Sequence, residues 1–205
     1  MDNRPADTIT TLTICYEGSS GEQTQRSVSV TQFDPHELFG LCQLRGQYRS
    51  FLYERIFSCV DANTGEVIHD LHAHLISIYR KSPRYTLDLL QRNHLEALQV
   101  LLYVGKADGQ LRAEERKVIA AACKVLTGDV RITEQMASDL IDSINIPSFH
   151  SFKVAVGRVA KRGNPGMMKR LIIACRTIVN TQKTVTATEQ EALDYMAKRF
   201  QLPQE

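Results

Sequence analysis

The sequence predicts an α+β protein, in which a small β-barrel at the N-terminus is followed by an all-α part. Up to residue 68 apolar residues alternate with polar ones, and from residue 69 they recur at helical spacing. The charge changes at the same place: residues 1–68 hold five Lys or Arg and nine Asp or Glu, a net charge of −4, and residues 69–205 carry +6. We therefore expect two units with different surfaces.

The N-terminal part predicts short strands separated by turns. The first strand runs through Leu12, Ile14 and Tyr16 and ends at the turn 18–21. Further apolar segments follow at 28–30, 38–44, 48–53, 56–60 and 66–68, with a loop at 61–65. β-Branched and aromatic residues between turn signals at this spacing are typical of a small barrel or sandwich.

The rest of the chain predicts about seven helices. Ser82-Pro83 is a helix start, because Ser caps a helix and Pro fits its first turn. Gly128 and Gly163 lie where helices should end. Helices are predicted around 69–84 and 85–104, and at 113–127, 133–144, 148–161, 166–180 and 187–200. We expect a barrel at 8–68, a linker helix at 69–84 and an all-α domain at 85–202.

Composition excludes several classes of protein. The five cysteines are widely spaced and odd in number, which favours buried thiols over a disulfide framework or a zinc ribbon. No apolar run approaches the roughly twenty residues of a membrane helix, and residues 1–7 are too polar for a signal peptide. We expect a cytoplasmic protein with no membrane span. Its oligomeric state is not predicted.

The helical part contains an internal similarity. The stretch 108–115 precedes one predicted helix and 182–189 precedes another, with Glu115 matching Glu189. Residues 104–116, with Asp108-Gly109 at their centre, resemble the helix–loop–helix signature of TerB-like domains from the tellurite-resistance family. The resemblance covers about 90–200 and implies an all-helical fold of two similar halves. Gln182-Lys183 departs from it, since the second half would have Asp-Gly there.

The N-terminal part carries a more specific pattern. Tyr16, Gly21 and Arg26 are followed by Leu38-Phe39-Gly40-Leu41-Cys42-Gln43-Leu44-Arg45 and then by Arg49-Ser50-Phe51-Leu52-Tyr53-Glu54-Arg55-Ile56. This order resembles the core of WYL domains over about 10–68. The triplet that names the family falls on 36–38, where only Leu38 is kept. The resemblance implies a small SH3/Sm-like barrel that senses a ligand, with nucleotides or nucleic acid as ligands.

Four arginines are the sharpest candidates for a binding site, because they are the only Lys or Arg of residues 1–68 besides Arg4. A planar guanidinium binds phosphate through two parallel hydrogen bonds. The alternative is that each arginine pairs with a nearby acid, such as Glu54, Glu37 or Asp34. The candidate ligand-binding residues are Arg26, Arg45, Arg49, Arg55, Tyr16 and Phe51.

A second candidate surface lies in the helical part. Between Asp142 and Glu189 the chain has eight Lys or Arg and no acid, which suits an acidic protein, nucleic acid or anionic lipid. The alternative is a set of solvated helix faces that point in different directions. The residues proposed for an anion or a partner here are Lys161, Arg162, Lys169 and Arg170.

The sequence gives less support for a metal site or for catalysis. Asp108-Gly109 with Glu115 has the spacing of a calcium loop, but Val104 and Lys106 occupy ligand positions. His69, His72 and His74 lie in a helical pattern, in which residues two apart do not face each other. No catalytic motif occurs, so we expect no metal, no cofactor and no enzyme.

The function predicted is a binding or sensing module: the barrel takes a nucleotide or nucleic acid, and the helical domain docks or relays. A protein–protein scaffold in a bacterial stress-response complex is the alternative.

Overall fold

The computed structural model describes residues 8–106, 109, 111–181 and 184–201. Its contacts divide the chain into two compact units, residues 1–82 and 83–205, and each is described by itself. No helix among the described residues is both long and apolar enough to cross a bilayer. The expectations for Asp108 and for Gln182-Lys183 concern positions outside the described residues.

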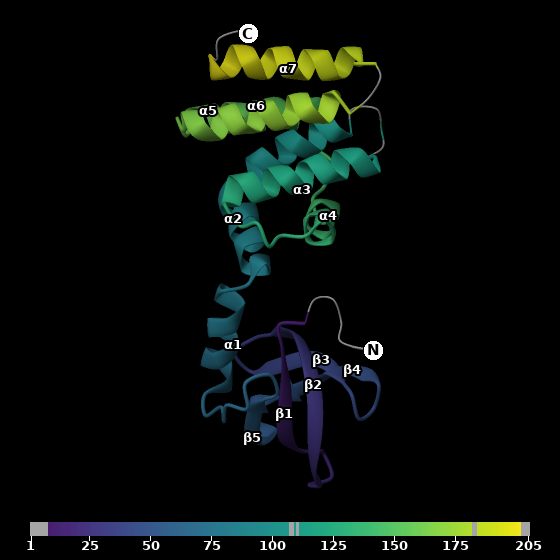
Figure 1. The fold of residues 1–205 in the computed structure, drawn as a ribbon, viewed down its shortest axis with the longest axis vertical. Coiled ribbons are helices and arrows are strands. Elements are labelled where there is room, and N and C mark those ends of the chain that lie inside the picture. Colours follow the sequence, from purple (N-terminus) through teal and green to yellow (C-terminus); the bar gives the residue numbers. More distant parts are fainter. Residues whose placement is uncertain (1–7, 107–108, 110, 182–183, 202–205) are drawn as a thin grey trace. The chain divides into compact units, whose positions relative to one another are not determined.

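The first unit is a five-stranded antiparallel sheet followed by a helix (Figure 1). The sheet order is β4-β3-β2-β1-β5, so consecutive strands form hairpins until β5 returns beside β1. The α+β class is confirmed. Within the described chain the sheet is open, with β4 and β5 as its edges, and the closed barrel that we expected is not shown. The elements are β1 (Thr10–Glu17), β2 (Gln23–Phe33), β3 (Glu37–Cys42), β4 (Gln47–Leu52), a short 3-10 helix η1 (Tyr53–Arg55), β5 (Ile56–Asp61) and α1 (Leu71–Arg80).

The sheet curls around an apolar core. Alternation places Leu12, Ile14, Val28, Val30 and Leu38 on one side, where all are fully buried. The rings of Tyr16 on β1 and Phe51 on β4 lie edge to face, with centroids 5.0 Å apart. Two strands separate β1 from β4, and neighbouring strands lie about 4.8 Å apart, so a flat sheet would hold them about 14 Å apart. The ring contact therefore requires strong curvature.

The curvature depends on the glycine at position 40. A Cβ on Gly40 would lie 2.2 Å from the carbonyl oxygen of Ser29, so the backbones of β2 and β3 approach more closely than any side chain would allow. Beside it the pairing of β2 with β3 shifts register between Val30 and Gln32. Such bulges bend a strand and increase its twist. Gly40 and the bulge together let the sheet wrap its core.

Residues 61–82 carry the chain from β5 into α1. The strand predicted at 66–68 is not formed, and only a single bridge joins Val60 to Val67. The strand does not form because the segment is short: only four residues lie between the turn at Gly65 and Asp70. Asp70 caps α1, and its side chain accepts a hydrogen bond from the Ala73 N–H. Leu75 of α1 is fully buried in the core of the sheet. The helix expected as a linker thus packs on the first unit.

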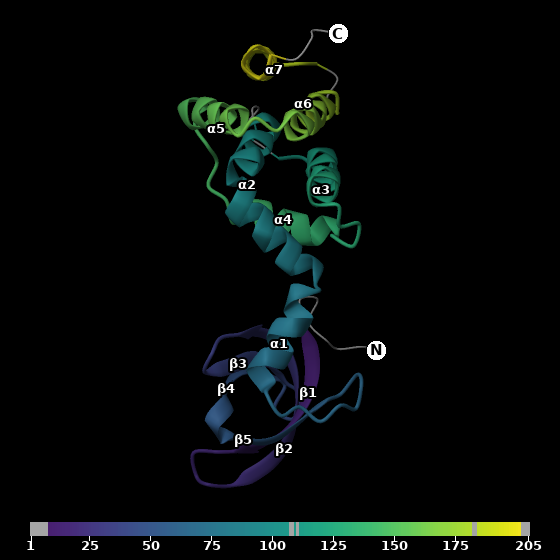
Figure 2. The same cartoon turned by 90° about the vertical axis from the view of Figure 1, so that its left-hand side faces the viewer.

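The second unit is all-α. Figure 2 shows its layers: α7 covers α5 and α6, and these cover α2 and α3, in agreement with the contacts between the helices. Thr133, Ser148 and Thr186 are N-caps, since each side chain accepts a hydrogen bond from the first turn of its helix. The helices are α2 (Pro83–Gly105), α3 (Ala113–Thr127), α4 (Glu134–Asp142), α5 (Phe149–Lys161), α6 (Pro165–Val179) and α7 (Ala187–Phe200).

α3 and α7 begin in a similar way. Glu115 and Glu189 are the third residues of their helices, and both are fully buried. Each carboxylate accepts a hydrogen bond from the backbone N–H of the residue before the helix, at 2.6 Å from Arg112 and 2.8 Å from Thr186. At α7 the hydroxyl of Thr186 also accepts a hydrogen bond from the Glu189 N–H, which completes a capping box. At α3 only the half in which the glutamate accepts is present, because the guanidinium of Arg112 has no acceptor. The internal similarity of the sequence therefore corresponds to two helix starts that share a buried glutamate.

Candidate anion-binding site

Four of the six predicted binding residues lie on one side of the sheet. Arg26 pairs across the strands with the core residue Ile14, and Arg49 lies two positions before Phe51 on β4. Residues two apart on a strand point to the same side. Arg26 and Tyr16 are half-buried, whereas Arg49 is exposed. We call the set Tyr16, Arg26, Arg49 and Phe51 the arginine face.

Arg26 is held by two aromatic rings and one hydroxyl. Its guanidinium carbon lies 5.6 Å from the ring centroid of Tyr16 and 6.0 Å from that of Phe51. Its Nε donates to the hydroxyl of Thr24 at 2.9 Å. These contacts fix the guanidinium and use only one of its nitrogens. Within the described part of the chain the two Nη atoms make no hydrogen bond, and they remain as a pair of donors.

None of the four arginines forms an ion pair with a carboxylate of the described residues. Two of the three acids named as possible partners, Asp34 and Glu37, make other hydrogen bonds. Asp34 accepts hydrogen bonds from the backbone N–H groups of His36 and Glu37, which lower the pKa of its carboxyl. Glu37 accepts one from the hydroxyl of Ser50 at 3.1 Å. The structure therefore does not have the ion pairing that was the alternative.

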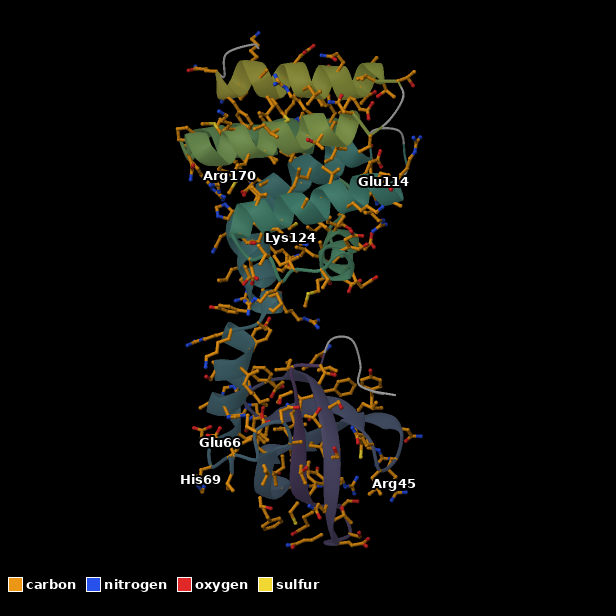
Figure 3. The ribbon with its side chains drawn as sticks, in the orientation of Figure 1. Arg45, Glu66, His69, Glu114, Lys124 and Arg170 are labelled. Atoms are coloured by element: carbon orange, nitrogen blue, oxygen red, sulfur yellow. The ribbon has the colours of Figure 1, made fainter. Side chains whose placement is uncertain are left out.

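The six candidates are not all brought together. Arg49 donates to the side chain of Gln47 at 3.3 Å. Arg45 lies in the exposed turn between β3 and β4, where Figure 3 labels it, and Arg55 lies in η1. Within the described chain neither of their side chains makes a hydrogen bond or an ion pair. The contacts join Tyr16, Arg26 and Phe51, and alternation adds Arg49.

The arginine face can bind an anion beside a flat ring. A guanidinium with two free Nη groups offers the parallel donors that phosphate accepts. Tyr16 is half-buried and offers part of a ring, whereas Phe51 is only 1% exposed and supports Arg26 from within the core. Phe51 therefore positions the arginine and does not itself line the surface.

Comparisons with family models, curated proteins and solved structures gave no match for this chain. What the arrangement does must be argued from its own chemistry.

A groove of about 420 Å³ in the same unit was not predicted from the sequence. It runs between η1 and β5 on one side and residues 68–72 on the other, and none of the four arginines lines it. Its lining includes Phe57, which is 60% exposed, and the rings of His69 and His72. The cluster of histidines was its only signal in the sequence.

The three histidines have different neighbours. His72 lies against the rings of Phe33 and Tyr53, with centroids 6.0 and 6.2 Å away. The Nε2 atom of His74 lies 3.2 Å from the Oδ2 atom of Asp61, and His69 lines the groove. Among the described residues no group of three or more His, Cys, Asp or Glu is placed to hold a metal ion.

Asp61 is a buried carboxylate at the end of β5. It accepts hydrogen bonds from the hydroxyl of Thr10 at 3.0 Å and from the backbone N–H groups of Asn63 and Thr64 at 2.8 and 3.2 Å. Burial alone would raise the pKa of Asp61, but these bonds and the contact with His74 hold it below its ordinary value. Asp61 is an ionised anchor that ties the sheet to α1.

The second predicted surface lies where α5 ends and α6 begins. Its four residues are exposed, and we call them the basic corner: Lys161, Arg162, Lys169 and Arg170. Arg162 lies 3.0 Å from a carboxylate oxygen of Glu96, and Arg170 donates to the carbonyl of Val125 at 3.4 Å. Lys161 and Lys169 form no ion pair with any described residue.

Arg162 also explains a break in α2. His94 has non-helical backbone angles, φ −137° and ψ 34°, in the middle of the helix. Such a break frees a carbonyl from the helical ladder. Arg162 donates to the carbonyl of Asn93 at 2.6 Å, while its other Nη reaches Glu96 beyond the break. The side chain of the residue that follows α5 thus contacts both halves of α2.

Proposed function

We propose that the sheet unit is a binding module for an anionic ligand, a nucleotide or a nucleic acid, and that the ligand binds at the arginine face. The observation that carries the proposal is Arg26, packed against Tyr16 and Phe51, with two Nη donors that no described carboxylate engages. The first 68 residues have nine acids, so an arginine without an acidic partner is unexpected there. An anion from outside the chain would supply the partner.

A nucleotide fits this chemistry better than a simple inorganic anion. Phosphate takes the two Nη donors of a fixed guanidinium. A base can stack on the exposed part of an aromatic ring, which contributes about 1–3 kcal/mol in single-strand binding proteins. Tyr16 offers such a ring next to Arg26, with the guanidinium carbon 5.6 Å from its centroid.

The sequence patterns support the same proposal. The WYL-like pattern includes Tyr16, Arg26 and Phe51, the three residues in contact, and that family is known for ligand-sensing barrels. We propose with it that the sheet unit is SH3/Sm-like, that the helical unit is TerB-like and docks or relays, and that the protein works in the cytoplasm. These assignments rest on the sequence patterns alone.

The test is a binding titration of the full chain with fluorescent single-stranded oligonucleotides, with AMP and ATP as competitors, at two salt concentrations. We expect salt-sensitive binding that Arg26→Gln weakens about 10- to 150-fold, because a hydrogen bond to a charged group contributes about 1.5–3 kcal/mol. Arg55→Gln is the matched control, since it removes the same charge from η1 of the same unit and should have a small effect.

Arg26→Lys sharpens the test. It keeps the charge but loses the planar fork, so it should retain the salt dependence and recover only part of the affinity. The proposal fails if the wild-type chain shows no salt-sensitive binding. It also fails if Arg26→Gln binds like the wild type while its thermal stability is unchanged. The scaffold function would then take its place.

A further inference from the structure

Two residues of the basic corner, Arg162 and Arg170, take part in the packing of the helices, but Lys161 and Lys169 form no ion pair with any described residue. The basic corner lies in the segment between Asp142 and Glu189, which has eight Lys or Arg and no acid. All residues from 161 to 166 are exposed. Two of its cations, Lys161 and Lys169, have no carboxylate partner among the described residues. The surface therefore keeps its positive charge.

A shallow hollow of about 340 Å³ opens beside the corner. Glu96, Arg158, Lys161 and Arg162 line it. The single acid is only 13% exposed and is shared by two guanidiniums, at 3.0 Å from Arg162 and 3.7 Å from Arg158. Three cations and one largely covered carboxylate give the hollow a net positive charge. An anion would find it attractive.

The last turn of α3 extends the same surface. Arg170 donates to the carbonyl of Val125, which brings α6 next to that turn and to Lys124. Figure 3 shows Lys124 and Arg170 toward the same end of α3, with Glu114 at the other end. Lys124 forms no ion pair within the described chain. Cations of α3, α5 and α6 thus gather at one end of the unit.

The stability of α6 does not account for these cations. The N-terminus of a helix carries partial positive charge and is stabilised by acids. The first turn of α6 has no acid, and Lys169 and Arg170 follow directly after it. The helix dipole therefore does not favour cations at this place.

We propose that the basic corner docks the sugar-phosphate backbone of a nucleic acid. The tip, residues 161–166, has the sequence Lys-Arg-Gly-Asn-Pro-Gly, with no aromatic or large aliphatic side chain. Protein partners usually need such buried anchors. Phosphates are instead bound by Lys, Arg, Asn and backbone N–H groups, which carry no sequence information. The surface should therefore bind nucleic acid without regard to sequence. The proposal uses only residues of the helical unit and does not depend on the arginine face.

The experiment measures binding of a fluorescein-labelled 20-nucleotide oligo(dT) to the full chain by anisotropy, from 50 to 200 mM salt. Lys161→Glu and Lys169→Glu should each weaken binding at least fivefold. Each should also reduce the slope of log affinity against log salt by about 0.7, the value for one phosphate contact of a single strand. Lys117→Glu is the matched control: it makes the same charge change near Glu114 and should stay within about twofold of the wild type.

Several results would overturn the proposal. One is that the wild-type chain does not bind the oligonucleotide at 50 mM salt. Another is that the corner variants and Lys117→Glu behave alike. Binding of poly-glutamate or of phosphatidylserine vesicles in place of the oligonucleotide would assign the corner to another partner. If only Arg26→Gln lowers the affinity, the arginine face is supported and the basic corner is refuted. If only the corner variants lower it, the reverse holds.

Discussion

Replacing Asp61 should unfold the sheet unit before the helical unit. Its carboxylate is 2% exposed and accepts hydrogen bonds from Thr10, Asn63 and Thr64, with His74 as a fourth neighbour. Asp61→Ala removes every acceptor and leaves buried donors without partners. Asp61→Asn keeps the oxygen that faces the N–H groups of Asn63 and Thr64. The two variants therefore separate the role of the backbone bonds from that of the charge.

The magnitudes follow from these bonds. Hydrogen bonds to a charged group contribute about 1.5–3 kcal/mol each and do not add fully, so Asp61→Ala should lower the free energy of unfolding of the sheet unit by about 3–4 kcal/mol. Asp61→Asn should lower it by about 1 kcal/mol. With a urea slope of about 1 kcal/mol per molar for a unit of this size, the midpoints should fall by about 3–4 M for Asp61→Ala and about 1 M for Asp61→Asn.

A urea titration followed by two-dimensional NMR measures the two units separately. Amide peaks of β1 and β5 report the sheet unit, and peaks of α3 report the helical unit and should not change. The lowered pKa of Asp61 also sets a pH dependence. Its contribution is complete above the unfolded pKa of about 3.9 and is lost as the pH falls through the folded pKa. The difference in the free energy of unfolding between the wild type and Asp61→Asn should therefore be present at pH 6 and become smaller below pH 4. Equal, small effects of both variants would refute the anchoring role.

Three more predictions concern the backbone and the buried groups. Gly40→Ala should destabilise the sheet unit by about 1–3 kcal/mol in the same titration, because its Cβ would lie 2.2 Å from the Ser29 carbonyl oxygen. Gly18→Ala should cost much less, because the nearest atom to its Cβ lies 3.6 Å away. Equal losses of stability in the two variants would contradict the close approach of β2 and β3. Glu189→Ala should lower the free energy of unfolding of the helical unit by about 2 kcal/mol, as measured in urea. Glu189→Gln should lower it less, because Gln keeps an acceptor for the Thr186 N–H. If both variants were as stable as the wild type, the capping box would not stabilise the unit. Burial raises the pKa of Cys59 and of Cys123 to about 12. A thiol reagent at pH 8 should therefore modify the half-buried Cys15 first, and Cys59 and Cys123 only after unfolding. Early labelling of Cys123 would contradict its burial.

Much of the helical unit could be predicted because its signals are local. Thr133, Ser148 and Thr186 act as caps through bonds to the residue three positions ahead, and Gly128 ends α3 with a φ of 75°. A sequence window contains everything that such a signal needs. The match of Glu115 with Glu189 was readable for the same reason.

Other features depend on contacts between distant segments. Pairing of β1 with β5 and the burial of Leu75 under the sheet bring together residues more than forty positions apart. The strand expected at 66–68 was wrong because the cap at Asp70 starts a helix too soon after Gly65. For the groove beside β5 the histidine cluster was the only local signal. For the binding residues, only the pairing of the strands shows that Arg26 and Arg49 lie on one side of the sheet and that Phe51 lies beneath Arg26.

The break in α2 has a mechanical consequence. Neither Pro nor Gly occurs near His94, so the backbone there has no built-in preference for a bend. The angle is set from outside, by the grip of Arg162 on the Asn93 carbonyl and on Glu96. The bend of α2 therefore depends on a side chain that lies outside α2. A shift of Arg162 would therefore act on the parts of α2 on both sides of His94.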